Sequence, residues 1–121
     1  MSDVEAIIAT MAEYAHLLDD GRLDEWADLY LEDGELDIAG QVLGGRTAIV
    51  EYLRTGYSAG SSTHIFSLPD IRVTGDQARA VADFLLVTNS SGAVSVGRVD
   101  DEWVRCPDRW RLRMRRISLK S

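Results

Sequence analysis

Cysteine, proline and histidine are scarce in this chain, and each shortage narrows the possible functions. The 121 residues include one cysteine, two prolines and two histidines. A single cysteine, Cys106, cannot form an internal disulfide or a multi-thiolate metal site. The sequence also contains no glycine-rich phosphate loop and no dinucleotide-binding fingerprint. We therefore expect neither a metal nor a cofactor.

Long apolar runs and net positive charge are missing as well. No stretch reaches the roughly 18 consecutive apolar residues that cross a bilayer, so no membrane partner is expected. The formal net charge of −7 argues against nucleic acid as a partner. The N-terminal stretch carries acidic residues where a signal peptide carries basic ones, which favours a cytoplasmic location.

The composition that is present is typical of one globular domain, expected to span residues 1–121. Apolar residues recur at helical spacing in three segments of the N-terminal half. These segments predict helices over residues 4–18, about 23–31 and 47–55. Asp3 is the expected N-cap of the first helix.

From residue 63 onward, the hydrophobic period changes to two, which predicts β-strands. The expected strands cover residues 63–74, 77–89, 93–106 and 109–119. The turns between them are short, so neighbouring strands should pair in antiparallel fashion. Helices followed by a strand meander indicate an α+β fold with helices on one face of a curved sheet. Such a cone can hold a small ligand.

Three polar side chains are candidates for chemistry. In an alternating strand, His64 shares a face with Phe66 and Leu68, which places its imidazole on an apolar surface. It is either a structural histidine or a general acid–base group. Asp19, at the end of the first helix, is either a helix-end charge or a partner for His64. Tyr14 lies on the opposite shoulder of that helix, as a core tyrosine or as a hydroxyl donor.

Four segments, in order and with matching gaps, resemble the SnoaL-like branch of the NTF2-like superfamily, which includes scytalone dehydratase. The resemblance covers about residues 5–118 and implies three N-terminal helices packed on a strongly curved antiparallel sheet that encloses a pocket. In this branch, an Asp at the end of helix one and a His on the strand after helix three form a catalytic pair. These positions match Asp19 and His64, and a helix-one tyrosine of some members matches Tyr14. The segments are LLDDGRLDEWADLYLEDGEL, GGRTAIVEYL, THIFSLPDIRVTGDQARAVADFLLV and GRVDDEWVRCPDRWRLRMRRI.

The match departs from scytalone dehydratase at two pocket positions. Where that enzyme has a second pocket histidine, this chain has Thr88 and Asn89 and no histidine. Its pocket asparagine has no counterpart around Val96 and Gly97. The scytalone reaction itself is therefore not expected.

The expected pocket is largely apolar, with a few hydroxyl groups. The hydroxyl of Tyr14, Thr88 or Tyr57 could stabilise a developing oxyanion. The residues predicted to bind substrate are Trp26, Tyr30, Leu53, Tyr57, Phe66, Phe84, Leu86, Thr88 and Met114.

These features predict a cofactor-independent lyase or isomerase. His64, supported by Asp19, would transfer a proton in a dehydration, elimination or double-bond shift on a small hydrophobic substrate, polycyclic ones included. A non-catalytic small-molecule-binding module is the alternative. A third reading is an interaction protein, in which the arginines of RWRLRMRRISL meet an acidic partner subunit. A homodimer is expected, with a trimer as the other option.

Overall fold

A computed structural model describes residues 1–120 and places three helices and seven strands in them. The helices are α1 (Asp3–Asp19), α2 (Leu23–Ala27) and α3 (Arg46–Gly56). The strands are β1 (Tyr30–Ile38), β2 (Gln41–Gly44), β3 (Ser62–Phe66), β4 (Asp70–Thr74), β5 (Gln77–Thr88), β6 (Val94–Arg105) and β7 (Trp110–Leu119).

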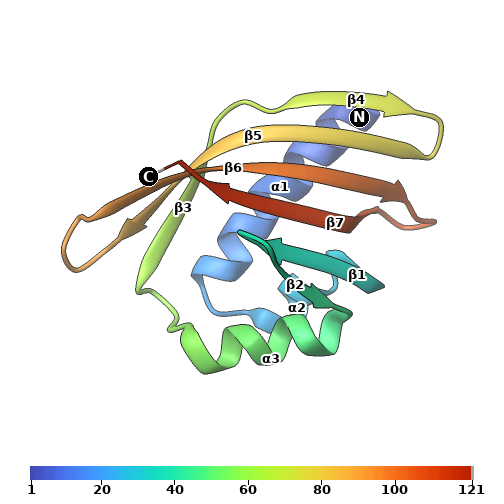
Figure 1. The fold of residues 1–121 in the computed structure, drawn as a ribbon. Helices are drawn as coiled ribbons and strands as arrows, with labels where there is room; N and C mark the ends of the chain where they lie inside the picture. The colour runs from blue at the N-terminus through green and yellow to red at the C-terminus, as the bar shows by residue number, and fades with distance from the viewer. Residues whose placement is uncertain (121) are drawn as a thin grey trace.

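All seven strands belong to one curved sheet that does not close on itself (Figure 1). The order is β2-β1-β7-β6-β5-β3, with β4 pairing β5 beside β3. The expected antiparallel meander is confirmed for β5, β6 and β7. The pair of β1 with β7 is parallel, which the sequence did not predict. The α+β class is confirmed.

Helix α1 packs along one face of the sheet and contacts β3, β4 and β7 (Figure 1). Ser2, rather than the predicted Asp3, is its N-cap. The Ser2 side chain accepts a hydrogen bond from the Glu5 backbone, and the Glu5 side chain accepts one from the Ser2 backbone. Val4 and Ile8 belong to the apolar spacing that predicts this helix, but they are 40% and 39% exposed. The buried face of the helix instead runs through Ile7, Met11 and Leu18, which are 6% exposed or less.

The predicted second helix, residues 23–31, is too long. Helix α2 ends at Ala27, and Tyr30 already pairs with Leu112 of β7. The region from Gly40 to Gly45 contains β2, which forms a hairpin with β1. Its tight turn falls at Ala39 and Gly40, where φ is +51° and +97°.

The single strand predicted over residues 63–74 is two strands, β3 and β4. The chain leaves β3 after Phe66 and passes through Ser67, Leu68 and Pro69 before it pairs with β5 again. Proline has no N–H to donate to a sheet, which accounts for the interruption.

The core lies between the three helices and the sheet, and aromatic side chains dominate one end of it. The Trp26 ring meets Tyr14 and Tyr30 edge-on, at centroid distances of 5.3 and 5.4 Å. All three side chains are 3% exposed or less. No helix within residues 1–120 is long and apolar enough to span a bilayer.

Candidate functional site

The two residues that the sequence predicted as a pair meet where the end of α1 reaches β3. The Nδ1 atom of His64 lies 2.6 Å from Oδ1 of Asp19. The backbone N–H of His64 also donates to both carboxylate oxygens of Asp19, at 3.2 and 3.0 Å. Each side chain is 16% exposed. Asp19 therefore fixes both the ring and the backbone of His64.

His64 forms part of the wall of an inner cavity of about 290 Å³. The cavity lies between α1 and the face of the sheet that α1 covers. Most of its lining is aliphatic or aromatic. Besides Tyr14, the lining residues with polar side chains are His64, Ser95 and Arg115. The lining residues are Tyr14, Leu18, Ile38, His64, Phe66, Phe84, Leu86, Ser95, Val99, Arg115, Ile117 and Leu119.

Arg115 is the one cationic residue among those lining residues, and it is 1% exposed. Its Nε and Nη2 atoms donate to the two carboxylate oxygens of buried Asp101, at 2.8 and 2.7 Å. Its guanidinium lies 4.0 Å from the centre of the Tyr14 ring and 5.2 Å from that of Phe66. Burial disfavours the charge, but Asp101 raises the pKa of Arg115 above its usual value. The cavity wall therefore contains a guanidinium group that is held in an ion pair with Asp101.

A shift in strand register explains why sequence reasoning missed Arg115. Leu112 is opposite Trp103 and Met114 is opposite Glu102, so Arg113 is an extra residue in β7. Such a bulge reverses the faces of all later residues. Simple alternation from Leu112 predicts Met114 inside, whereas the structure turns Arg115 inward. No feature of the local sequence marks this bulge.

Tyr14 contributes its ring to the cavity, but its hydroxyl is engaged elsewhere. The Tyr14 and Tyr30 hydroxyl oxygens lie 2.8 Å apart in the core. Burial raises the pKa of both phenols, that of Tyr30 more strongly. The two tyrosines are therefore neutral hydrogen-bond partners of each other.

The predicted substrate-binding residues divide into two groups. Phe66, Phe84 and Leu86 line the inner cavity, as expected. The other six lie outside its lining: Trp26, Tyr30, Leu53, Tyr57, Thr88 and Met114.

Core packing, strand register and position in the fold explain why these six residues lie outside the cavity lining. Trp26 and Tyr30 are fully buried in the core beside the cavity, and Met114 is turned away by the bulge in β7. Thr88 is exposed at the end of β5. Leu53 and Tyr57, at the end of α3, pack against the core from another side.

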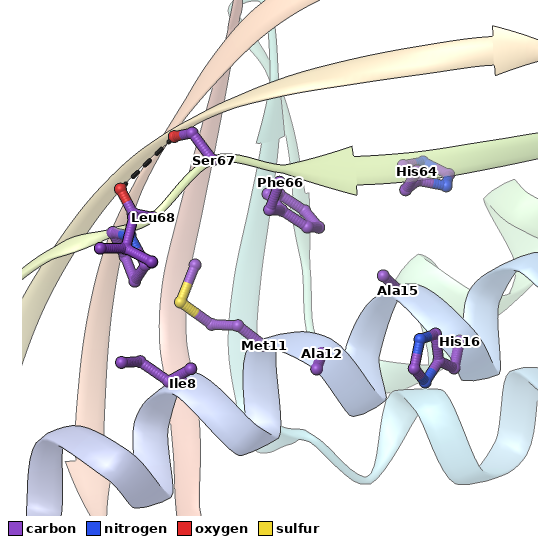
Figure 2. Close-up of a pocket in the computed structure, with 10 residues that line it drawn as sticks. Ile8, Met11, Ala12, Ala15, His16, His64, Phe66, Ser67 and Leu68 are labelled. Atoms are coloured by element: carbon purple, nitrogen blue, oxygen red, sulfur yellow. Dashed lines mark hydrogen bonds between the residues drawn. The ribbon is translucent and has the colours of Figure 1, made fainter.

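A second depression, an outer groove of about 270 Å³, lies between α1 and the segment from His64 to Pro69. Figure 2 shows Ile8 and Met11 of the helix facing Phe66 and Leu68 across it. His64 and Phe66 line both the groove and the inner cavity. These two side chains therefore form the partition between the two spaces.

No group of three or more His, Cys, Asp or Glu side chains suited to holding a metal ion is found within residues 1–120. The polar groups that meet at the inner cavity are an acid-supported imidazole and an acid-supported guanidinium. An imidazole can accept a proton, and a fixed cation can stabilise negative charge on oxygen.

Solved structures with the same fold place the chain among NTF2-like proteins. One NTF2-like protein from Novosphingobium aromaticivorans is 26% identical, with a TM-score of 0.83 over 98% of this chain and 82% of that one. A Catenulispora acidiphila protein in complex with S-DNPA is 25% identical, with a TM-score of 0.83 over 95% and 91% of the two chains.

A candidate scytalone dehydratase from N. aromaticivorans has the same fold, with 23% identity and a TM-score of 0.84 over 97% of this chain and 83% of its own. No curated protein matches the sequence. The family model of the SnoaL-like domain matches residues 1–116, so the chain belongs to the SnoaL-like family.

Proposed function

We propose that this protein is a cofactor-independent lyase or isomerase that transfers a proton on a small, largely apolar substrate. The observation that carries the proposal is the Asp19–His64 pair in the wall of an apolar cavity that also contains Arg115. A base and a fixed cation bordering one cavity suit the removal of a proton next to a carbonyl group.

His64 is the general base in this proposal. A carboxylate at 2.6 Å from Nδ1 favours the tautomer in which Nδ1 carries the proton. The Nε2 atom is then free to accept a proton from the substrate. Asp19 stabilises the imidazolium that forms, and the second bond, from the His64 backbone, keeps the carboxylate in place.

Arg115 is the group that stabilises the negative charge in this proposal. Removal of a proton next to a carbonyl places charge on the carbonyl oxygen, and a preorganised cation lowers the energy of that state. Asp101 engages Nε and Nη2, which leaves Nη1 for a substrate oxygen. This role replaces the hydroxyl donors expected from the sequence, because the Tyr14 hydroxyl is paired with Tyr30.

The same first step leads to either class of reaction. In a dehydration, the His64 imidazolium returns its proton to a departing hydroxyl group, and water leaves. In a double-bond shift, the proton returns to another carbon of the enolate. The candidate scytalone dehydratase among the fold relatives is named for a dehydration, which makes elimination the first reaction to test.

A non-catalytic small-molecule-binding module is the second candidate. The aromatic walls of the cavity, which include Tyr14, Phe66 and Phe84, favour ligand binding whether or not a reaction follows. A structural relative holds a small molecule, S-DNPA, in its complex. Binding and catalysis must therefore be measured separately.

The deciding experiment compares turnover and affinity on one panel of ring-bearing β-hydroxy ketones and β,γ-unsaturated ketones. Asp19→Asn and His64→Gln should each lower turnover by about 10²-fold or more, with ligand affinity changed by less than about threefold. His16→Gln, an exposed histidine on α1, is the matched control and should keep full turnover. A wild-type protein that binds panel members without converting them would support the binding module instead.

The expected cytoplasmic homodimer, with a trimer as alternative, stays a prediction. The outer face of the sheet carries cross-strand ion pairs, such as Arg79 with Asp100 and Arg98 with Asp83. A charged face of this kind favours a polar contact between subunits over an apolar one. Light scattering coupled to size-exclusion chromatography at low and high salt measures the mass and its salt dependence.

A further inference from the structure

Gly97 and Phe84 lie directly opposite each other in the antiparallel pair of β6 and β5. A Cβ atom built on Gly97 would overlap Cζ and Cε1 of the Phe84 ring. The tip of the ring therefore occupies the space that any other residue at position 97 would fill. Only glycine allows the ring to lie this close to the backbone of β6.

The position of this ring determines the shape of the inner cavity. Ser95 and Val99 lie on either side of Gly97 along the inner face of β6, and both line the cavity. Gly97 does not, because Phe84 covers it and forms the cavity surface at that point. A ring pushed away from Gly97 would move toward Phe66, its partner in β3 on the other side of β5, whose ring lies 6.1 Å from it, centre to centre.

We propose that Gly97 is a specificity-determining residue that admits ligands with two fused rings to the inner cavity. With glycine, the Phe84 ring stays down on the sheet and the cavity keeps its volume of about 290 Å³. With a side chain at position 97, the ring stands into the cavity and leaves room for a single ring. This proposal rests on the proposed function only in placing the ligand in this cavity, and it requires no catalytic step.

The ligand class follows from the walls around this space. Three aromatic side chains in the lining, those of Tyr14, Phe66 and Phe84, favour a flat ring system. The buried guanidinium of Arg115 favours one oxygen substituent on that ring system. A two-ring hydroxyarene combines both features, and its one-ring analogue differs from it only in size.

An aromatic ring over a glycine also stabilises a sheet, and that is the structural alternative for this pair. A purely structural role predicts that a substitution at Gly97 lowers stability and affects all ligands alike. A role in specificity predicts a change in the preference between large and small ligands. Ligand size preference is therefore the readout that separates the two.

The test measures binding of phenol and 2-naphthol by calorimetry to the wild type, Gly97→Ala, Phe84→Leu and the double variant. The wild type should bind 2-naphthol more tightly than phenol. Gly97→Ala should lose about tenfold or more in 2-naphthol affinity while its phenol affinity changes by less than about threefold. The double variant should recover 2-naphthol binding, because leucine lacks the ring atoms that would be displaced.

The double variant also controls for strain elsewhere. The added Cβ at position 97 would lie 2.8 Å from the carbonyl oxygen of Ser118, so Gly97→Ala also strains β7. If that strain causes the loss, the double variant will not recover, and the proposal is wrong. Equal losses for both ligands in Gly97→Ala would overturn it as well.

Failure of this proposal is distinguishable from failure of the proposed function. If the wild type binds neither compound, the inner cavity is not a site for this ligand class and the proposal falls. The proton-transfer role of His64 is measured by turnover and by its tautomer, which do not involve Gly97. A crystal structure of Gly97→Ala should show the Phe84 ring displaced into the cavity, and an unmoved ring would contradict the mechanism proposed here.

Discussion

Asp19 accepts hydrogen bonds from both the backbone N–H and the Nδ1 position of the same residue, His64. One carboxylate thereby joins the last residue of α1 to β3 and orients the imidazole. Because the Asp19 carboxylate binds two donors of His64, the imidazole ring has little freedom to rotate. The arrangement fits a histidine that must present the same nitrogen to a ligand at every encounter.

The first prediction concerns the tautomer of His64. Long-range ¹H–¹⁵N correlation spectra of the neutral ring should show the proton on Nδ1, because Asp19 accepts it. Asp19→Asn removes the charged acceptor and should shift the population toward the Nε2–H tautomer. His16→Gln identifies the signals, since the chain has only two histidines. A His64 tautomer that ignores the change at Asp19 would remove the basis for the proposed general base.

A second prediction concerns the buried pair of Asp101 and Arg115. Asp101→Asn should lower the free energy of unfolding by about 3–5 kcal/mol, because it leaves a buried guanidinium without its counter-charge. Urea unfolding measures the loss. The double variant Asp101→Leu with Arg115→Met should recover much of it, since it buries no charge. A loss below about 1 kcal/mol for Asp101→Asn would mean that water or another group reaches Arg115.

A third prediction separates a structural from a catalytic role for Tyr14. Tyr14→Phe keeps the ring against Arg115 but leaves the buried Tyr30 hydroxyl without its partner. The free energy of unfolding should fall by about 1–3 kcal/mol, with turnover changed less than for Asp19→Asn. The matched variant Tyr14→Phe with Tyr30→Phe should regain stability. If Tyr14→Phe lowers turnover without lowering the free energy of unfolding, Tyr14 takes part in catalysis.

The fourth prediction concerns alkaline pH. Burial raises the pKa of both Tyr14 and Tyr30 in the folded protein, while an unfolded tyrosine titrates near its usual pKa of about 10. The unfolded state therefore loses these protons first as the pH rises, so their contribution to stability is complete below about pH 10 and falls above it. Urea midpoints measured on both sides of that pH should show the decline.

The double variant Tyr14→Phe with Tyr30→Phe is the control for the alkaline decline. It lacks both buried phenols, so its urea midpoint should fall less steeply above about pH 10. An equally steep fall in this variant would assign the decline to other groups. Tyrosinate absorbance of the folded wild type supplies an independent count of the phenols that ionise before unfolding.

Much of the fold and the central pair could be predicted from residues that are close in the sequence. The apolar spacing of α1 and the alternation in β5 and β6 specify their own elements, because local periodicity decides which face is buried. Asp19 and His64, 45 positions apart, were predicted as a pair through the family resemblance, with the helical wheel giving only a possible contact.

The cavity lining was harder to predict, because it depends on how elements meet. Trp26 and Tyr30 have the composition of pocket residues, yet α2 and β1 bury them fully in the core. Ser95 lines the inner cavity only because β6 pairs with β5 in the observed register. Hydrophobic character identifies buried residues, but it does not distinguish a core side chain from one that borders a cavity.

The sequence by itself determined the α+β class, with helices first and the antiparallel strands β5, β6 and β7 last. Together with the family resemblance it also identified the acid–histidine pair. Only the tertiary structure decided that Arg115, and not Met114, faces the cavity, since the extra residue Arg113 reverses the alternation of β7. The physical reason lies in the pairing of β7 with β6 and β1. A strand alternates strictly until a neighbour forces one residue out of register, and that event depends on contacts far apart in the chain.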